Sequence, residues 1–187
     1  MDTEEKLKEL EKEINALKDT VVKFEKNAPE NKLAMVIFSG DLDKALAAFI
    51  IATGAVAMGM EVVMFFTFWG VPLLRKKGGV SKGKDFFGKM FGAMLPKGAS
   101  KAKLSKMDMG GMGTQMMKHL MKKKNVASLD DMISLAAELE VKVYICEMSM
   151  DLMGFSRSEI IDYPDIGFSG VAKFLEEAGT SKAQMFI

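Results

Sequence analysis

The chain has 187 residues, a formal net charge of +1 and one cysteine, which suits one domain with an appendage. One cysteine excludes an intramolecular disulfide framework and a zinc site built from several cysteines. The charged first residues do not resemble a secretory leader, and a single free thiol suits a reducing compartment, so a cytoplasmic protein is expected.

The first 28 residues predict an amphipathic, coiled-coil-like helix that forms a separate unit. Apolar side chains recur at alternating intervals of three and four residues, and we call them the α-helical seam: Leu7, Leu10, Ile14, Leu17, Val21 and Phe24. A helix of this length is only marginally stable alone and needs a partner for its seam, either a second copy or the body of the protein. A homo-oligomer is therefore expected.

Residues 33–187 predict an α/β domain. Apolar runs at 33–38 and 61–68 are typical of buried parallel strands, and the helical period of 42–58 joins them in a βαβ unit. Further helices are predicted at 128–140, 150–161 and 168–178, with strands at 141–145 and 184–187. The expected fold class is a three-layer α/β/α domain with a mainly parallel sheet of about five strands, preceded by the N-terminal helix.

Residues 45–74 are strongly apolar, and Glu61 is their only charged residue. A membrane-spanning helix needs about 20 apolar residues. Glycines and Glu61 interrupt the run near residue 60, and the residues that follow favour a strand. Insertion into a membrane is therefore not expected.

Residues 71–128 form a long basic excursion from the predicted fold. Residues 75–124 carry fourteen Lys or Arg and two acidic side chains, whereas residues 125–187 carry four basic and eleven acidic ones. This asymmetry favours small anionic ligands or an acidic protein partner. Nucleic acid is not expected, because the excursion contains no recognised binding motif. The alternative is a solvated, lysine-rich insertion, with a short amphipathic helix predicted at 84–95.

Methionines crowd the second half of the excursion, where His119 also lies. They are Met107, Met109, Met112, Met116, Met117 and Met121. Thioether sulfur is a soft ligand that suits Cu(I), but methionine is more often a flexible apolar filler at adaptable surfaces. Neither a metal site nor a cofactor is expected.

The most informative residue is Cys146, at the junction of a predicted strand with a helix-like stretch. In an open α/β sheet, ligands bind at the carboxyl ends of the strands. The backbone N–H groups of Glu147, Met148 and Ser149 can stabilise a thiolate there. The same edge should hold the residues that follow the first two strands, and these candidate binding residues are Gly40, Asp41, Trp69 and Gly70. An inert, buried core cysteine is the competing interpretation.

Residues 33–187 resemble the DsrE/DsrF/DrsH-like family, in the branch of the DsrE-like sulfur carriers. The resemblance rests on four segments: Phe65–Gly70, Leu104–Gly113, Met121–Val126 and, above all, Cys146–Gly154. It implies that Cys146 accepts sulfane sulfur as a persulfide or thiosulfonate. It also implies transfer to TusA-like or rhodanese-like proteins. Since Cys146 is the only cysteine, relay between two thiols of one chain is excluded.

Three functions remain open from the sequence. The first is a sulfur carrier, sulfurtransferase-like in its chemistry, which needs an exposed thiolate at Cys146. The second is a non-catalytic oligomeric binding module with an inert thiol and a ligand at the basic excursion. The third is a Cu(I)-binding protein that uses its methionines. For the first, we expect residues 75–124 to cover or border the thiol and attract anionic donors, with Lys122, Lys123 and Lys124 contributing.

Overall fold

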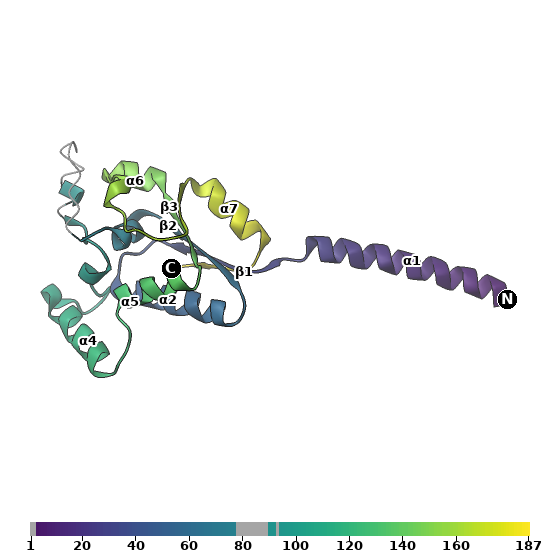
Figure 1. Ribbon diagram of the computed structural model, residues 1–187, viewed down its shortest axis with the longest axis horizontal. Coiled ribbons are helices and arrows are strands. Elements are labelled where there is room, and N and C mark those ends of the chain that lie inside the picture. Colours follow the sequence, from purple (N-terminus) through teal and green to yellow (C-terminus); the bar gives the residue numbers. More distant parts are fainter. Residues whose placement is uncertain (1–2, 78–89, 93) are drawn as a thin grey trace. The chain divides into compact units, whose positions relative to one another are not determined.

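The structure is a computed structural model that describes residues 3–77, 90–92 and 94–187 (Figure 1). The chain divides into two compact units, one ending at Glu30 and the other spanning Asn31–Ile187. The first unit is helix α1 (Thr3–Asn27), which has Glu4 and Glu5 in its first turn, where the helix dipole favours acidic side chains. None of the helices in the described residues is long and apolar enough to cross a membrane.

The second unit is built on a five-stranded parallel sheet. Its strands are β1 (Glu30–Ile37), β2 (Glu61–Phe66), β3 (Lys142–Cys146), β4 (Ile166–Ser169) and β5 (Ser181–Phe186). Their order is β4-β3-β2-β1-β5. The first three neighbouring pairs are parallel by register, and β5 continues the pattern through Ile187, which donates to Val36 and accepts from Phe38. The predicted fold class, with its N-terminal helix, is confirmed.

Helices α2 (Leu42–Ala57) and α5 (Leu129–Glu138) lie on one side of the sheet, and α6 (Glu147–Met153) and α7 (Val171–Thr180) lie on the other (Figure 1). Val143 and Ile145 of β3 belong to the core on the α2 and α5 side. Because strand side chains alternate, Tyr144 and Cys146 point to the opposite face. The fold thus turns the thiol away from the main core.

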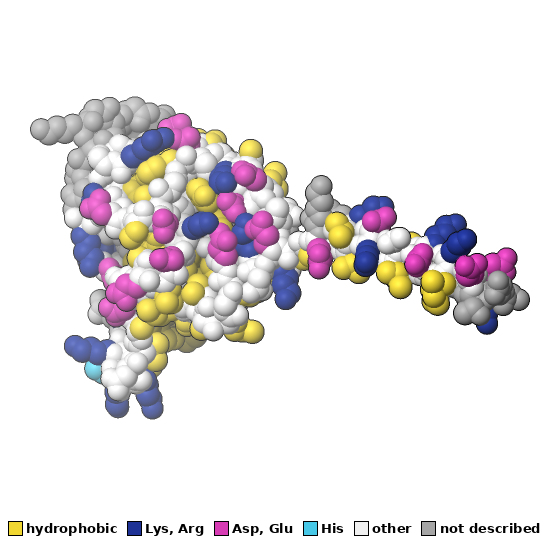
Figure 2. Space-filling view, turned by 45° about the vertical axis from the view of Figure 1, so that its right-hand side comes forward, with side chains coloured by type: hydrophobic (Ala, Val, Ile, Leu, Met, Phe, Trp, Pro, Cys, Tyr) yellow, Lys and Arg dark blue, Asp and Glu magenta, His cyan; other side chains and the backbone are white. Residues whose placement is uncertain are grey.

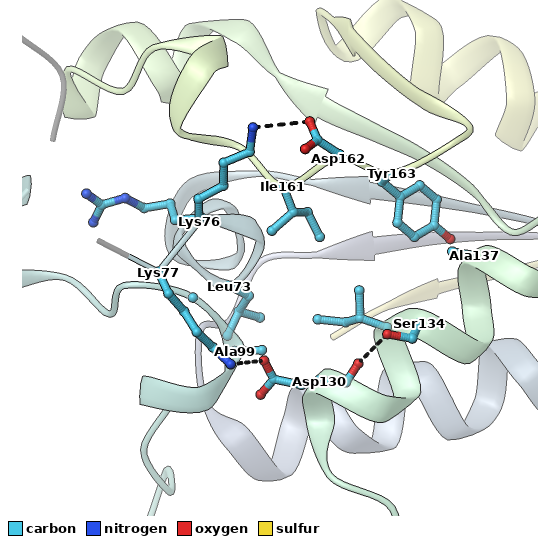
Figure 3. A pocket seen from close by; sticks show the side chains of 13 residues that line it. Leu73, Lys76, Lys77, Ala99, Asp130, Ser134, Ala137, Ile161, Asp162 and Tyr163 are labelled. Atoms are coloured by element: carbon cyan, nitrogen blue, oxygen red, sulfur yellow. Dashed lines mark hydrogen bonds and ion pairs between the residues drawn. The ribbon is translucent and has the colours of Figure 1, made fainter. Parts of the chain in front are cut away.

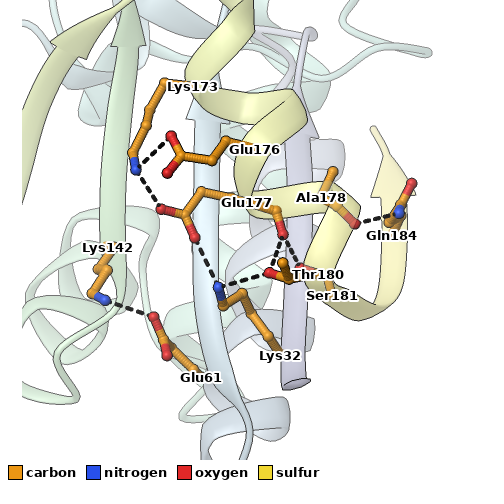
Figure 4. A network of polar contacts seen from close by, with 10 residues as sticks. All are labelled: Lys32, Glu61, Lys142, Lys173, Glu176, Glu177, Ala178, Thr180, Ser181 and Gln184. Carbon is orange, nitrogen blue, oxygen red and sulfur yellow. Dashed lines mark hydrogen bonds and ion pairs between the residues drawn. The ribbon is translucent and has the colours of Figure 1, made fainter. Parts of the chain in front are cut away.

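Helix α7 covers the second face of the sheet at its centre. The ring of Phe174 lies 5.7 Å from that of Phe65 on β2. Beside it, the buried Lys32 forms an ion pair of 2.9 Å with Glu177, which also pairs with Lys173 at 2.9 Å (Figure 4). Burial alone would raise the pKa of Glu177, but the two lysines outweigh it and lower this pKa. Because Lys32 lies on β1 and Glu177 lies on α7, this network holds α7 against the sheet.

The described residues of the second unit also form shorter elements. They are η1 (Phe68–Leu74), η2 (Ala99–Lys101), η3 (Met109–Gly111), α4 (Met112–Lys123) and η4 (Arg157–Glu159). The predicted helix at 84–95 lies mostly outside the described residues. The helix predicted at 150–161 has other bounds: α6 begins at Glu147, directly after the thiol, and ends at Met153, and η4 is a separate short turn.

The prediction of a helix beginning at Phe168 was wrong. Phe168 and Ser169 belong to β4, where they pair with Ile145 and Cys146, and α7 begins only at Val171. The reason is that β3 pairs with β2 along one side only. The backbone N–H and C=O groups along its other side need a second strand as a hydrogen-bond partner, and β4 is that strand. This strand adds a neighbour to Cys146.

Candidate functional site at the carboxyl edge of the sheet

Cys146 is the last residue of β3 and the N-cap of α6. Its backbone is extended, with φ −67° and ψ 111°. The residue is only 4% exposed, so the expectation of an exposed thiol was wrong for this structure. The position is at the edge where ligands bind in open α/β sheets, whereas the burial leaves little of the residue accessible to a donor.

Ser169 is the register partner of Cys146 on the neighbouring strand β4. Directly paired residues project their side chains from the same face of a sheet, which places this hydroxyl beside the thiol. The Ser169 Oγ atom is buried and makes no hydrogen bond with any residue that the structure describes. Because buried hydroxyls are nearly always hydrogen-bonded, this one is available to an atom that joins the site. The sequence prediction missed Ser169, since it assigned that residue to a helix.

The three residues after Cys146 have different surroundings. Glu147 forms an ion pair with Arg157, whose guanidinium lies 4.7 Å from the ring centroid of Phe168. Met148 is exposed. Their backbone N–H groups belong to the first turn of α6, where a helix supplies no internal acceptors. That these N–H groups stabilise an anion on Cys146 stays a prediction.

Ser149 has a structural role that the sequence did not reveal. It is fully buried, and its Oγ lies 3.0 Å from Thr67 Oγ1 and accepts a hydrogen bond of 3.1 Å from the Phe68 backbone N–H. Phe68 has a φ of 42°, which is uncommon for an aromatic residue. The Ser149 side chain thus fixes the strained start of η1 against α6 and joins the ends of β2 and β3.

The predicted residues at the ends of β1 and β2 also meet. A Cβ atom on Gly40 would lie 2.4 Å from the Trp69 carbonyl oxygen, and one on Gly70 would lie 2.2 Å from the Ile37 carbonyl oxygen. The two segments approach this closely only because both positions are glycine. Asp41 is the N-cap of α2 but makes no capping hydrogen bond with its side chain; it accepts one from Ser39 instead.

A groove of about 700 Å³ opens beside this glycine contact. Trp69, which is 45% exposed, and the less exposed Phe38 supply apolar surface. The remaining lining residues include Gly40, Asp41, Met94, Leu95, Pro96 and four lysines: Lys44, Lys97, Lys101 and Lys103. Lys44 pairs with Asp41, but the other three form no ion pair with any residue that the structure describes. We call these three the groove lysines.

Cys146 does not line this groove. The predicted site residues therefore form two neighbouring groups, one around Cys146 and one around the groove. The segment 67–69 connects them, because Phe68 binds Ser149 while Trp69 lines the groove. The arrangement allows a ligand or protein to dock in the groove next to the edge where the thiol lies.

The basic excursion contributes to the groove only in part. Six of its residues, all within 94–103, line the groove. Lys122 and Lys123 lie instead in the last turn of α4, which appears on the α2 and α5 side of the sheet in Figure 1. Lys122 lines a different cavity, of about 460 Å³, together with the start of α5. Their placement therefore does not support the expectation that Lys122–Lys124 border the thiol.

A further pocket of about 590 Å³ lies between η1, α5 and residues 161–163 (Figure 3). Its two exposed cations are neutralised, since Lys76 pairs with Asp162 and Lys77 pairs with Asp130, each at 3.1 Å. The groove lysines therefore provide the stronger attraction for an anion.

Metal ligands do not cluster in the part of the chain that the structure describes: no three His, Cys, Asp or Glu side chains are placed to hold an ion together. Several methionines of the excursion are exposed, with Met107 at 73% and Met112 at 66%.

Comparisons with known proteins show which family the chain belongs to. The model of the DsrE/DsrF/DrsH-like family matches residues 29–186. The chain is 47% identical over 156 residues to the uncharacterized protein YrkE of Bacillus subtilis (strain 168), covering 83% of this chain and 96% of that protein. It is 39% identical over 170 residues to the sulfur carrier protein DsrE2 of Allochromatium vinosum, covering 84% of this chain and 99% of that protein.

Among solved structures, the crystal structure of the ychN protein from E. coli matches with a TM-score of 0.49 at 10% identity, over 83% of this chain and 98% of that one. The family match covers nearly all of the α/β unit and includes Cys146, whereas the whole of α1 lies outside it. The chain belongs to the DsrE/DsrF/DrsH-like family.

Proposed function

We propose that this protein is a sulfur carrier that holds sulfane sulfur on Cys146 and passes it to the thiol of a partner protein. The observation that carries the proposal is the position of Cys146, the only cysteine. It lies at the carboxyl end of the internal strand β3, beside a buried hydroxyl without a partner among the described residues. The name of the Allochromatium vinosum relative supports the same role.

The proposed reaction has two transfers of one sulfur atom. The Cys146 thiolate attacks the outer sulfur of an anionic donor such as thiosulfate or a polysulfide; the new S–S bond forms as the donor's own S–S bond breaks, and the remainder leaves as sulfite or a shorter polysulfide. An acceptor thiolate, on a TusA-like or rhodanese-like protein, then attacks the outer sulfur. The Cys146 thiolate is the leaving group and is regenerated.

Replacing Cys146 by Ser should abolish sulfur loading. After incubation with polysulfide, thiosulfate or tetrathionate, intact-mass analysis of the unmodified protein should show an adduct that dithiothreitol removes. Met148→Leu is the matched control, because it changes the exposed neighbour but keeps the thiol. The absence of an adduct from all three donors on the unmodified protein would disprove the carrier function.

Ser169→Ala should slow sulfur transfer about tenfold, because a hydrogen bond to a charged group contributes roughly 1.5 kcal/mol or more. We expect the Ser169 hydroxyl to donate to the sulfur anion on Cys146. Ser169→Thr retains the hydroxyl and should restore most of the rate. Stopped-flow measurement of loading and release tests this, and equal rates for the Ala and Thr variants would exclude a role for the hydroxyl.

Reversing the charge of the groove lysines should slow loading from thiosulfate about tenfold at low ionic strength, since electrostatic steering changes association rates by that order. The matched control is the triple change of Lys122, Lys123 and Lys124 to Glu, which alters the net charge equally on and beside α4. Added salt should reduce the difference between the two variants. Equal slowing by both would assign the effect to overall charge.

A non-catalytic binding module is the second candidate, because the thiol is buried and the groove is open. This function predicts that Cys146 forms no sulfur adduct while the protein still binds an anionic ligand or an acidic partner at the groove lysines. The mass measurement above separates the two functions.

A further inference from the structure

Helix α1 carries a seam that nothing in its own unit covers. All six seam side chains are exposed, and on the face drawn in Figure 2 apolar side chains gather along one edge of the helix, with charged side chains elsewhere on that face. The described part of this unit, residues 3–30, contains no second helix. A seam of this kind is stable in water when another helix buries it.

The spacing of the seam defines its heptad positions. A step of three residues runs from position a to position d, and a step of four runs from d to the next a. Positions a are therefore Leu7, Ile14 and Val21, and positions d are Leu10, Leu17 and Phe24. β-Branched residues at a, combined with leucine at d, favour two parallel strands. Two of the three a positions and two of the three d positions follow that rule.

The charged residues beside the seam select one orientation. Position g holds Lys6 and Glu13, and position e holds Glu11 and Lys18. In a parallel pair, each g residue faces the e residue five positions later in the other helix. Lys6 then meets Glu11 of the second copy, and Glu13 meets Lys18, so every one of these contacts joins opposite charges.

An antiparallel pair of the same helices would bring like charges together. When the two seams overlap along their full length, Leu10 faces Val21 of the second copy. Residues at position e then lie beside residues at e of the other helix, and residues at g lie beside residues at g. Glu13 would then face Glu13, Lys18 would face Lys18, and Glu11 would face Glu25. We propose that α1 forms a parallel two-stranded coiled coil with a second copy of this chain.

A disulfide introduced into the seam tests the orientation. In the full chain with Cys146→Ser, the variants Leu10→Cys and Val21→Cys should each form an interchain disulfide with themselves under mild oxidation, because a parallel pair places identical positions face to face. If a disulfide forms only when the two variants are mixed, the helices are antiparallel. If none forms, the seam has no second copy. Either result overturns the proposal.

Charge exchange tests the pairing itself. In the Leu10→Cys, Cys146→Ser chain, the double change Lys6→Glu with Lys18→Glu leaves only like charges between identical copies, as does Glu11→Lys with Glu13→Lys. Each variant alone should crosslink at least about tenfold more weakly at low ionic strength, and an equal mixture should restore crosslinking as a mixed disulfide. Restoration on mixing shows that both variants still form the helix. Crosslinking that does not depend on these charges overturns the proposal.

Discussion

Replacing Arg75 by Met should lower the free energy of unfolding by about 3–5 kcal/mol, the usual cost of removing one member of a buried ion pair. Arg75 and Glu159 are 3% and 2% exposed, and the guanidinium lies 3.0 Å from the carboxylate. The substitution removes the cation that faces a carboxylate buried in the core. It also removes a cation–π contact, since the guanidinium lies 4.4 Å from the centroid of the Phe155 ring.

Urea denaturation measures this effect, and two variants control it. Lys76→Met breaks the neighbouring ion pair with Asp162, which is 96% exposed, and should cost less than about 1 kcal/mol. Arg75→Met combined with Glu159→Gln should cost less than the single change, because the buried carboxylate that faced the guanidinium is then neutral. If Arg75→Met alone had the same free energy of unfolding as Lys76→Met, the buried ion pair would contribute little to stability.

Gly70→Ala should have the second largest effect, a loss of about 3 kcal/mol. The new Cβ atom would lie 2.2 Å from the Ile37 carbonyl oxygen and 3.0 Å from its carbonyl carbon, so the backbone at the ends of β1 and β2 must separate. Trp69 in the groove and Phe68 beside Ser149 belong to the same segment. We therefore expect slower sulfur loading as well as lower stability.

Gly54→Ala is the control for Gly70→Ala. Gly54 lies within α2, and a Cβ atom there would meet nothing within 4 Å. Alanine should therefore stabilise the helix by about 0.5–1 kcal/mol. Thermal unfolding of both variants tests the pair of predictions. A Gly70→Ala protein as stable as the unmodified chain would show that the two strand ends adapt without cost.

Local sequence patterns were sufficient to predict several elements. The apolar run at 33–38 predicted β1, and the helical period of 128–140 predicted α5. In the structure, Ser128 Oγ accepts from the Asp131 backbone N–H, and the Asp131 side chain accepts from the Ser128 backbone N–H. These features depend on residues a few positions apart, where period and capping chemistry act directly.

The sequence also predicted that Cys146 ends a strand, and that Gly40, Trp69 and Gly70 lie at the same edge of a parallel sheet. Both predictions follow from the order of strands and helices, because βαβ connections make the strands parallel, and parallel strands have their carboxyl ends at one edge of the sheet. The structure agrees on these positions and adds the close approach of the two glycines. Their function in sulfur transfer remains a prediction.

The environment of the thiol depended on the tertiary structure. Ser169 became its neighbour through pairing between strands that are distant in sequence, and the short, half-buried β4 has too weak an alternation to predict that register. The burial of Cys146 depends on which elements cover its face of the sheet, and residue type does not determine that. The placement of the lysines of the excursion also depended on the tertiary structure, although their number was evident from the sequence. Only folding separated the groove lysines from those at the end of α4, because a charge acts where the backbone places it.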